Sequence, residues 1–160
     1  MLCSCPTLEI LRVTEGVSAR EITEGGPWVC QRLRELEICI CVQDTERDLQ
    51  PLIFERLSTL VRLARLDMGV DDDDMDGRDA LEFRLNCGSE HLVSLKELRV
   101  QGFNYLPTNM YVQRLGTQDI EWMVNNWETL EGIHGYLNYD YMVNVQLKNI
   151  LDIHGILHSS

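Results

Sequence analysis

The most informative segment of this sequence reads Leu33-Arg34-Glu35-Leu36-Glu37-Ile38-Cys39-Ile40. Its leucines stand three residues apart at first, and from Leu36 onward the apolar side chains recur at every second position. A period of two puts alternate side chains on opposite faces of a strand, whereas a helix repeats about every 3.6 residues. The segment therefore predicts a short strand with one buried face.

The same pattern recurs along the chain. Each copy has the form Leu-x-x-(Leu or Ile)-x-(apolar or Gly), with another apolar residue three positions before its first leucine. Successive copies begin 25, 30, 32 and 35 residues apart, which is longer and less even than the roughly 20 to 29 residues of ordinary leucine-rich repeats. The copies are Leu8, Leu11, Val13; Leu33, Leu36, Ile38; Leu63, Leu66, Met68; Leu95, Leu98, Val100; and Leu130, Ile133, Gly135, preceded by Cys5, Cys30, Leu60, Leu92 and Trp127.

Helical segments are predicted between these strands. Ser18 and Glu21 have the spacing of a capping box, and Pro51 suits the first turn of a helix. Apolar residues at helical spacing follow Thr117, and a further helix is expected from Asp140 to a stop near Gly155. Alternation over residues 81–85 predicts one extra strand.

These elements predict an α/β fold with one domain over residues 1–160. We expect a leucine-rich-repeat solenoid with long irregular repeats, in which short parallel strands alternate with helices. One alternative stays open, because Leu57, Leu60, Leu63 and Leu66 also fit a single helix face.

Composition limits the classes of partner. The net charge of −12 disfavours nucleic acid and anionic membranes, since phosphate is bound chiefly by Lys and Arg. The sequence shows no secretory signal and no apolar run near the roughly 20 residues that span a bilayer. We therefore expect an intracellular protein, cytoplasmic or nuclear, whose six cysteines are reduced.

The predicted partner-binding surface is the outward face of the strands. Residues that flank the buried positions of such strands face out of the concave sheet, and mixed charges beside an aromatic residue suit a protein ligand. A solvated face without a partner is the alternative. The candidate residues are Arg12, Thr14, Glu35, Glu37, Arg65, Asp67, Glu97, Arg99, Gln101, His134 and Tyr136.

The acidic run over residues 71–79 gives a second hypothesis, a calcium-dependent binding domain. Asp72, Asp74 and Asp76, followed by Gly77, match the start of a calcium loop. The match fails at the twelfth position, where Phe83 stands in place of the bidentate Glu. A plain acidic loop is the simpler interpretation.

We find no nucleophile, phosphate-binding or zinc motif in the sequence, and we nominate no catalytic residue and no cofactor. The protein is therefore expected not to be an enzyme, although an enzyme of unrecognised type remains a third hypothesis. A missing motif by itself does not exclude one.

The chain resembles the C-terminal region of the F-box and leucine-rich-repeat proteins of early-diverging filamentous fungi. The likeness covers most of residues 5–157 and rests on Trp28-Val29-Cys30 with residues 33–38, on residues 81–88 before 95–100, and on residues 121–130. In that family an F-box docks the Skp adaptor of a ubiquitin ligase while the repeats present a substrate. No segment here matches an F-box. The resemblance therefore implies that this chain recognises a substrate. It implies a Skp-type adaptor as a partner only if the protein has an F-box outside this sequence. We expect a C-terminal fragment of a longer protein.

Overall fold

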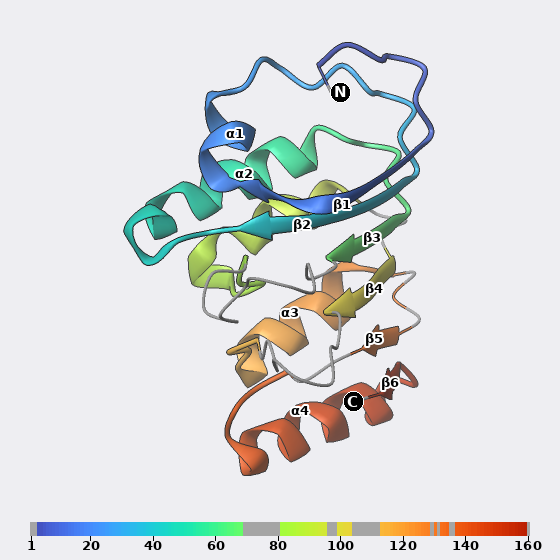
Figure 1. The fold of residues 1–160 in the computed structure, drawn as a ribbon. Coiled ribbons are helices and arrows are strands. Elements are labelled where there is room, and N and C mark those ends of the chain that lie inside the picture. The colour runs from blue at the N-terminus through green and yellow to red at the C-terminus, as the bar shows by residue number, and fades with distance from the viewer. Residues whose placement is uncertain are drawn as a thin grey trace.

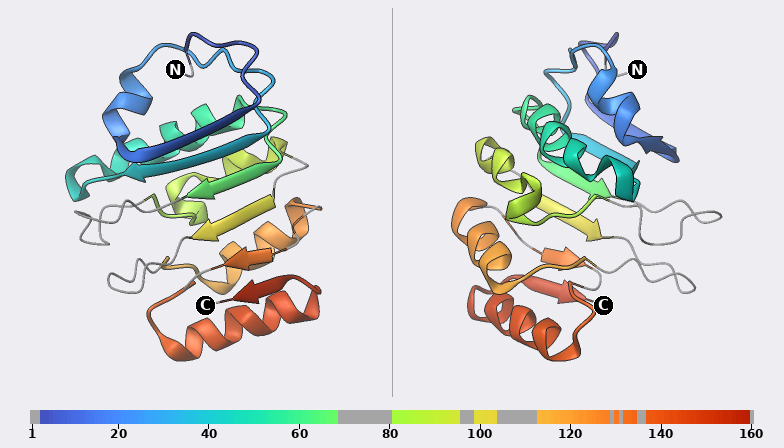
Figure 2. Two further views of the ribbon diagram at one scale, coloured as in Figure 1. Left: turned by 45° about the vertical axis from the view of Figure 1, so that its right-hand side comes forward. Right: turned by 90° about the vertical axis from the view of Figure 1, so that its left-hand side faces the viewer.

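The computed structural model describes residues 3–68, 81–95, 99–103, 113–128, 130, 132–134 and 137–159. Within these ranges, strands and helices alternate along the chain. The strands follow one another in chain order from β1 to β6, and the longer helices α2, α3 and α4 form a layer on one side of them (Figures 1 and 2). One face of the strands thus packs on helices.

A four-stranded parallel sheet has the order β1-β2-β3-β4. Its strands are β1 (Ile10–Ser18), β2 (Glu35–Cys41), β3 (Arg65–Met68) and β4 (Arg99–Phe103). Leu11 pairs with Leu36, and Leu36 pairs with Leu66. The first three copies of the sequence pattern therefore lie side by side in the predicted register.

The fourth copy is displaced from its predicted register. Leu66 pairs with Val100, and Arg65 pairs with Arg99, where the pattern predicted Leu98 and Glu97 as the partners. The difference is two residues, and a shift of two keeps every side chain on its own face of the sheet. The alternation of apolar and polar residues is therefore equally consistent with the predicted and the observed register of β4.

A second parallel sheet contains β5 (Gly132–His134) and β6 (Leu157–Ser159). β5 follows β4 in the stack, and β6 lies beside it at the end of the molecule (Figure 1). The sequence pattern did not predict β6, because three residues are too short to show a period.

The four α-helices described begin at or within one residue of the positions that the sequence predicts. α1 (Ala19–Glu24) has the Ser18–Glu21 capping box, α2 (Gln50–Ser58) carries a proline in its first turn, and α3 spans Thr117–Asn126. α4 (Tyr141–Ile153) is capped by Asp140, which accepts hydrogen bonds from two backbone N–H groups. Three 3₁₀ helices complete the set: η1 (Asp44–Leu49), η2 (Leu85–Cys87) and η3 (Ser89–Ser94).

All five copies of the pattern begin with the same backbone turn. In each copy the N–H of the first leucine donates to the carbonyl oxygen of the apolar residue three positions earlier, at 2.8 to 3.2 Å. The five pairs are Leu8 with Cys5, Leu33 with Cys30, Leu63 with Leu60, Leu95 with Leu92, and Leu130 with Trp127. The sequence similarity between copies therefore corresponds to one repeated local structure.

Neighbouring copies are also joined at equivalent positions. The Cys30 thiol donates to the carbonyl oxygen of Cys5 at 3.0 Å, and Trp127 Nε1 donates to that of Leu92 at 3.4 Å. The buried apolar residues of the copies that the structure describes belong to one core, which includes Leu33, Leu63 and Leu95.

The extra strand predicted over residues 81–85 is absent, and this prediction is wrong. Residues 81–84 have no regular secondary structure and lead into η2. The N–H groups of Glu82 and Phe83 donate to the side chains of Gln50 and Gln113 rather than to a neighbouring strand. Leu81 and Phe83 are buried all the same, which explains their apolar character.

Gly88 allows this segment to pack closely on α2. It has a positive φ of 101°, and a Cβ at this position would lie 2.6 Å from Cα of Pro51. A side chain would therefore collide with backbone there, in a conformation that L-residues rarely adopt.

In the described part of the chain, no helix is both long and apolar enough to span a membrane.

Candidate functional site

The sheet brings five of the predicted partner-binding residues together. Arg12 lies on β1, Glu35 and Glu37 on β2, and Arg65 and Asp67 on β3. They alternate with Leu11, Leu36 and Leu66, which are buried on the other face. We call these five residues the strand-face patch: Arg12, Glu35, Glu37, Arg65 and Asp67.

Register explains why the patch is continuous. Arg12 pairs with Glu37, Glu35 pairs with Arg65, and Glu37 pairs with Asp67 across the parallel strands. Paired residues on parallel strands point to the same side, so side chains that are 25 to 55 residues apart in sequence become neighbours.

The Arg12–Glu37 ion pair of the patch is exposed and therefore weak, whereas in the Arg65–Asp67 pair the Asp67 side chain is only 14% exposed. Arg12 Nε lies 3.4 Å from Glu37 Oε2, and Arg65 Nη2 lies 3.7 Å from Asp67 Oδ2. The Arg12 and Glu37 side chains are 63% and 45% exposed, and pairs this exposed contribute about 0 to 1 kcal/mol. A binding partner could thus replace the Arg12–Glu37 contact at little cost.

The patch is shallow. The recess lined by its five residues together with Leu11 and Leu36 has a volume of about 10 Å³, which is room for no more than about one water molecule. Such a surface has too little depth to enclose a small molecule, but it can lie against another protein.

The structure does not describe the side chains of the other predicted partner-binding residues. Thr14 lies on β1, Arg99 and Gln101 on β4, and His134 on β5, but their side chains lie outside what the structure describes. Glu97, Tyr136 and the calcium candidates Asp72, Asp74 and Asp76 also lie outside the described residues. Arg99 was predicted to align with Asp67; its backbone instead pairs with that of Arg65 because of the two-residue shift in β4.

On β2 the strand-face patch ends at Glu37. Cys39, two residues further along the strand on the same side, is only 4% exposed. β2 is buried on both faces from Ile38 to Ile40.

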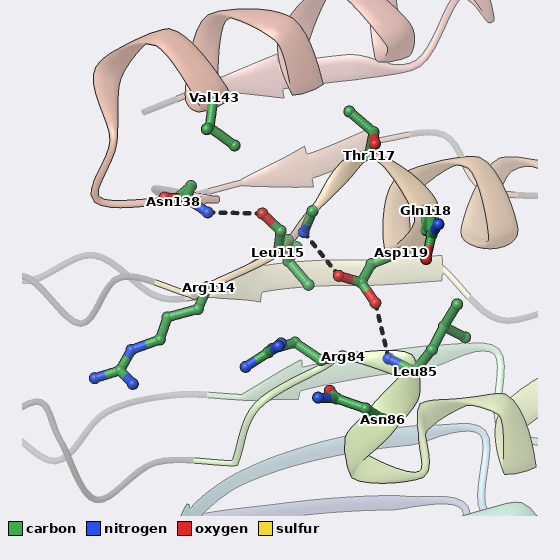
Figure 3. A pocket seen from close by; sticks show the side chains of 11 residues that line it. Arg84, Leu85, Asn86, Arg114, Leu115, Thr117, Gln118, Asp119, Asn138 and Val143 are labelled. Atoms are coloured by element: carbon green, nitrogen blue, oxygen red, sulfur yellow. Dashed lines mark hydrogen bonds between the residues drawn. The ribbon is translucent and has the colours of Figure 1, made fainter.

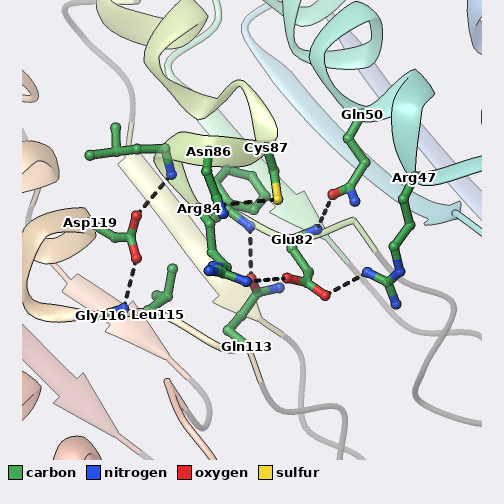
Figure 4. Close-up of polar contacts among 12 residues, drawn as sticks. Arg47, Gln50, Glu82, Arg84, Asn86, Cys87, Gln113, Leu115, Gly116 and Asp119 are labelled. Atoms are coloured by element: carbon green, nitrogen blue, oxygen red, sulfur yellow. Dashed lines mark hydrogen bonds and ion pairs between the residues drawn. The ribbon is translucent and has the colours of Figure 1, made fainter. Parts of the chain in front are cut away.

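Polar side chains form a second group where the strands end, which we call the carboxyl edge. It comprises residues 43–50, 81–88 and 113–119, which follow or lie beyond β2, β3 and β4. Gln113 is buried, accepts from the N–H of Phe83 at 2.8 Å and donates to the carbonyl oxygen of Leu81 at 3.1 Å (Figure 4). Gln50 accepts from the N–H of Glu82 at 3.0 Å.

Asp119, at the start of α3, continues this series. Its Oδ1 accepts from the N–H of Leu85 at 2.8 Å, and its Oδ2 accepts from the N–H of Gly116 at 2.7 Å (Figure 3). Side chains of one unit therefore satisfy backbone groups of a neighbouring unit, which joins the units along this edge.

Glu82 connects two arginines of the carboxyl edge. Its Oε1 lies 2.6 Å from Arg47 Nη1, and its Oε2 lies 3.5 Å from Arg84 Nη1. Partial burial lowers the pKa of the Arg47 guanidinium, but its bonds to Asp44 and Glu82 outweigh burial, so that pKa lies above its ordinary value. Arg47 therefore stays charged at any physiological pH.

A hollow of about 550 Å³ opens at this edge (Figure 3). We call it the edge pocket. It adjoins a smaller hollow of about 370 Å³ that reaches Arg47 and Glu82, and both are lined by Arg84, Asn86 and Arg114. The residues that line the edge pocket are Arg84, Leu85, Asn86, Arg114, Leu115, Gly116, Thr117, Gln118, Asp119, Asn138 and Val143.

The chemistry of these hollows gives no support for nucleophilic catalysis. Burial, with the charge of Glu82 added, raises the pKa of the Cys87 thiol at the smaller hollow. A catalytic cysteine needs the opposite shift, because the thiolate is the nucleophile. Among the described residues, no three His, Cys, Asp or Glu side chains gather as a metal site.

Sequence reasoning missed the edge pocket entirely. Arg84, Arg114 and Asp119 belong to no motif, and they come from segments that the repeat pattern treats as connections. One weak signal was present: Gln113 and Arg114 are polar residues before an apolar helix, in the place where a repeat turns from strand to helix.

The fold and both surfaces can be compared with known proteins. Searches with the whole chain against protein-family models, curated proteins and solved structures found no significant match.

Proposed function

We propose that this chain is a leucine-rich-repeat-like solenoid, without catalytic activity of its own, that recognises another protein across the strand-face patch. The register of β1, β2 and β3 is the observation that carries the proposal, because it gathers Arg12, Glu37 and Arg65 on one exposed face. Repeat scaffolds bind partners across such extended faces.

The repeated backbone turn supports the solenoid part of the proposal. The same hydrogen bond begins all five copies although they differ in length by up to ten residues. A repeat that keeps its turn while its connections vary is typical of stacked supersecondary units.

The depth of the patch supports a macromolecular partner. A recess of about 10 Å³ leaves a small molecule largely in water, whereas small-molecule sites usually measure about 300 to 1,000 Å³. Charges of both signs on a shallow face can instead meet complementary charges on a protein and fix its orientation.

The resemblance to F-box and leucine-rich-repeat proteins extends the proposal. It favours a partner that is a substrate of a ubiquitin ligase, recognised inside the cell. The net charge of −12 also favours a protein over nucleic acid.

Quantitative affinity purification with mass spectrometry tests this proposal. The full-length gene product would be compared with Glu37→Lys and Arg65→Glu, which reverse charges of the patch. We expect one set of proteins to be lost from both variants, because reversed charges repel the surface that the native charges attract. Co-purification of a Skp adaptor in all forms would support the ligase role.

Matched controls are available on other surfaces. Glu55→Lys reverses an exposed charge on α2, and Arg62→Glu does so in the turn before β3. Both should retain the captured proteins, and all four variants should melt within a few degrees of the native protein. If capture by Glu37→Lys and Arg65→Glu equals that of the controls, the patch is not the binding surface.

A further inference from the structure

Two arginines extend to the same side of the edge pocket. Arg84 precedes η2 and Arg114 precedes α3, and Figure 3 shows both side chains pointing the same way from their separate segments. The chain has 14 Lys and Arg against 26 Asp and Glu. A pocket lined by two arginines and a single carboxylate, Asp119, therefore has a charge opposite to that of the molecule as a whole.

The backbone on either side of Arg114 is held in place. Gln113 makes two hydrogen bonds to residues 81 and 83, and the Leu115 N–H donates to the carbonyl oxygen of Leu137 at 2.9 Å. The carbonyl oxygen of Leu115 also accepts from Asn138 Nδ2 at 2.8 Å. Arg114 thus projects from a fixed point, which reduces the conformational entropy lost on binding.

Arg84 is held in a similar way. The N–H of Phe83, just before it, donates to Gln113, and the carbonyl oxygen of Arg84 accepts from the N–H of Cys87 at 2.9 Å. Gln113, the residue before Arg114, is therefore bonded to the residue before Arg84. Figure 4 shows Gln113 beside Arg84.

The donors of Arg114 are available to a ligand. Its guanidinium lies 5.8 Å from the centre of the Tyr139 ring, and stacking on a ring occupies the face of a guanidinium but not the N–H groups at its rim. No carboxylate of the described residues forms an ion pair with Arg114.

Competition from acidic neighbours is limited. Both oxygens of Asp119 accept backbone N–H groups at 2.7 and 2.8 Å, so this carboxylate is not directed at either arginine. Glu82 holds Arg47 at 2.6 Å but Arg84 only at 3.5 Å. The shorter contact is the stronger, which leaves Arg84 free to turn to an incoming anion.

We propose that the edge pocket binds an oxyanion, either a carboxylate or a phosphomonoester, on a side chain of the recognised protein. Planar guanidinium groups match both anions because two parallel N–H donors can meet two oxygens. The hollow of about 550 Å³ is larger than one such group and leaves room for the residue that carries it. That the oxyanion belongs to a protein rests on the function proposed above, whereas the anion site itself does not.

NMR titration of the isotope-labelled chain tests the site without any partner. Three probes would be used: inorganic phosphate, N-acetyl-O-phosphoserine amide and N-acetylaspartate amide. We expect saturable shifts of the Arg84 and Arg114 Nε–H signals and of the amide signals of Thr117 and Gln118. Sodium chloride at matched ionic strength corrects for screening of the many surface charges.

Arg114→Gln is the decisive variant, because the Arg114 side chain makes no ion pair with the described residues. We expect it to weaken binding of the preferred probe at least about tenfold, as for loss of a charged hydrogen bond. Arg114→Lys keeps the charge but lacks the planar guanidinium group. Its affinity for the probe should therefore lie between those of the native chain and Arg114→Gln. Arg62→Gln, an exposed arginine at the opposite ends of the strands, should bind like the native chain.

The outcomes separate the two sources of the oxyanion. Tighter binding of the phosphoserine probe identifies a phosphomonoester, and tighter binding of the aspartate probe identifies a carboxylate. Shifts no larger than those in sodium chloride, or equal loss in Arg62→Gln and Arg114→Gln, would overturn the site. A failed capture experiment on the strand-face patch would leave these titrations unchanged, so the two proposals fail independently.

Discussion

Gln113 accepts a hydrogen bond from the backbone N–H of Phe83 at 2.8 Å, across 30 residues of sequence. Its amide nitrogen donates at the same time to the carbonyl oxygen of Leu81. The side chain thereby makes both a donor and an acceptor contact with the backbone of residues 81–83. It is buried, and so are the residues that it contacts.

Removal of this amide should destabilise the protein strongly. Gln113→Met keeps the volume but leaves two buried backbone groups without that partner, at about 1 to 3 kcal/mol each. We expect a loss of roughly 2 to 6 kcal/mol in the free energy of unfolding, measured by urea denaturation. Gln118→Met, on the exposed side of α3, should change it by less than about 0.5 kcal/mol. Equal effects of the two substitutions would show that the amide contacts do not stabilise the edge.

The apolar core of the stack can be probed at Leu36. This residue is 1% exposed and pairs with Leu11 and Leu66 on the flanking strands. Leu36→Ala should cost roughly 2 to 5 kcal/mol, since it leaves a cavity between three strands. Leu52→Ala removes the same atoms from a side chain that is 46% exposed and should cost much less. A neutral Leu36→Ala would mean that the register of β2 is misplaced.

The N-cap of α4 offers a smaller, local test. Asp140 accepts from the N–H groups of Met142 and Val143 at 2.8 and 3.2 Å. Asp140→Ala should lower the free energy of unfolding by about 1 kcal/mol, because both donors then lose their protein partner. Asn149→Ala, on the solvent side of the same helix, is the matched control. Circular dichroism during thermal unfolding would measure both, and equal melting temperatures would contradict the role of the cap.

The capping box of α1 predicts a dependence on pH. Hydrogen bonds from the Ser18 backbone N–H, and then from its hydroxyl, lower the pKa of Glu21 below its ordinary value of 4.5. The folded state therefore binds this proton less readily than the unfolded chain. The stabilisation is complete above the unfolded pKa and is lost as the pH falls through the lower folded pKa.

Glu21→Gln removes this titration while keeping a side chain that can serve in a capping box. We expect the native chain to be the more stable of the two near neutral pH, and the difference to vanish in acid. Melting temperatures of both proteins across the acid range provide the measurement. A difference that stays constant with pH would show that the Glu21 charge plays no part.

The local structure of each unit could be predicted from the amino-acid sequence. The leucine spacing predicted the strands that the structure has at β1, β2, β3 and β5, and Ser18, Pro51 and Asp140 marked the starts of their helices. These features depend on groups within about four residues of each other, so their chemistry can be read from adjacent positions. The same information gave the five residues of the strand-face patch.

The way in which neighbouring units meet could not be predicted from the sequence. The pairing of Val100 rather than Leu98 with Leu66 does not change which face a side chain occupies, so the pattern could not reveal it. The contacts of Gln113 with Phe83 and of Asp119 with Leu85 join residues 30 and 34 positions apart. Such contacts arise from stacking, and the edge pocket with its two arginines exists only because stacking brings their segments together.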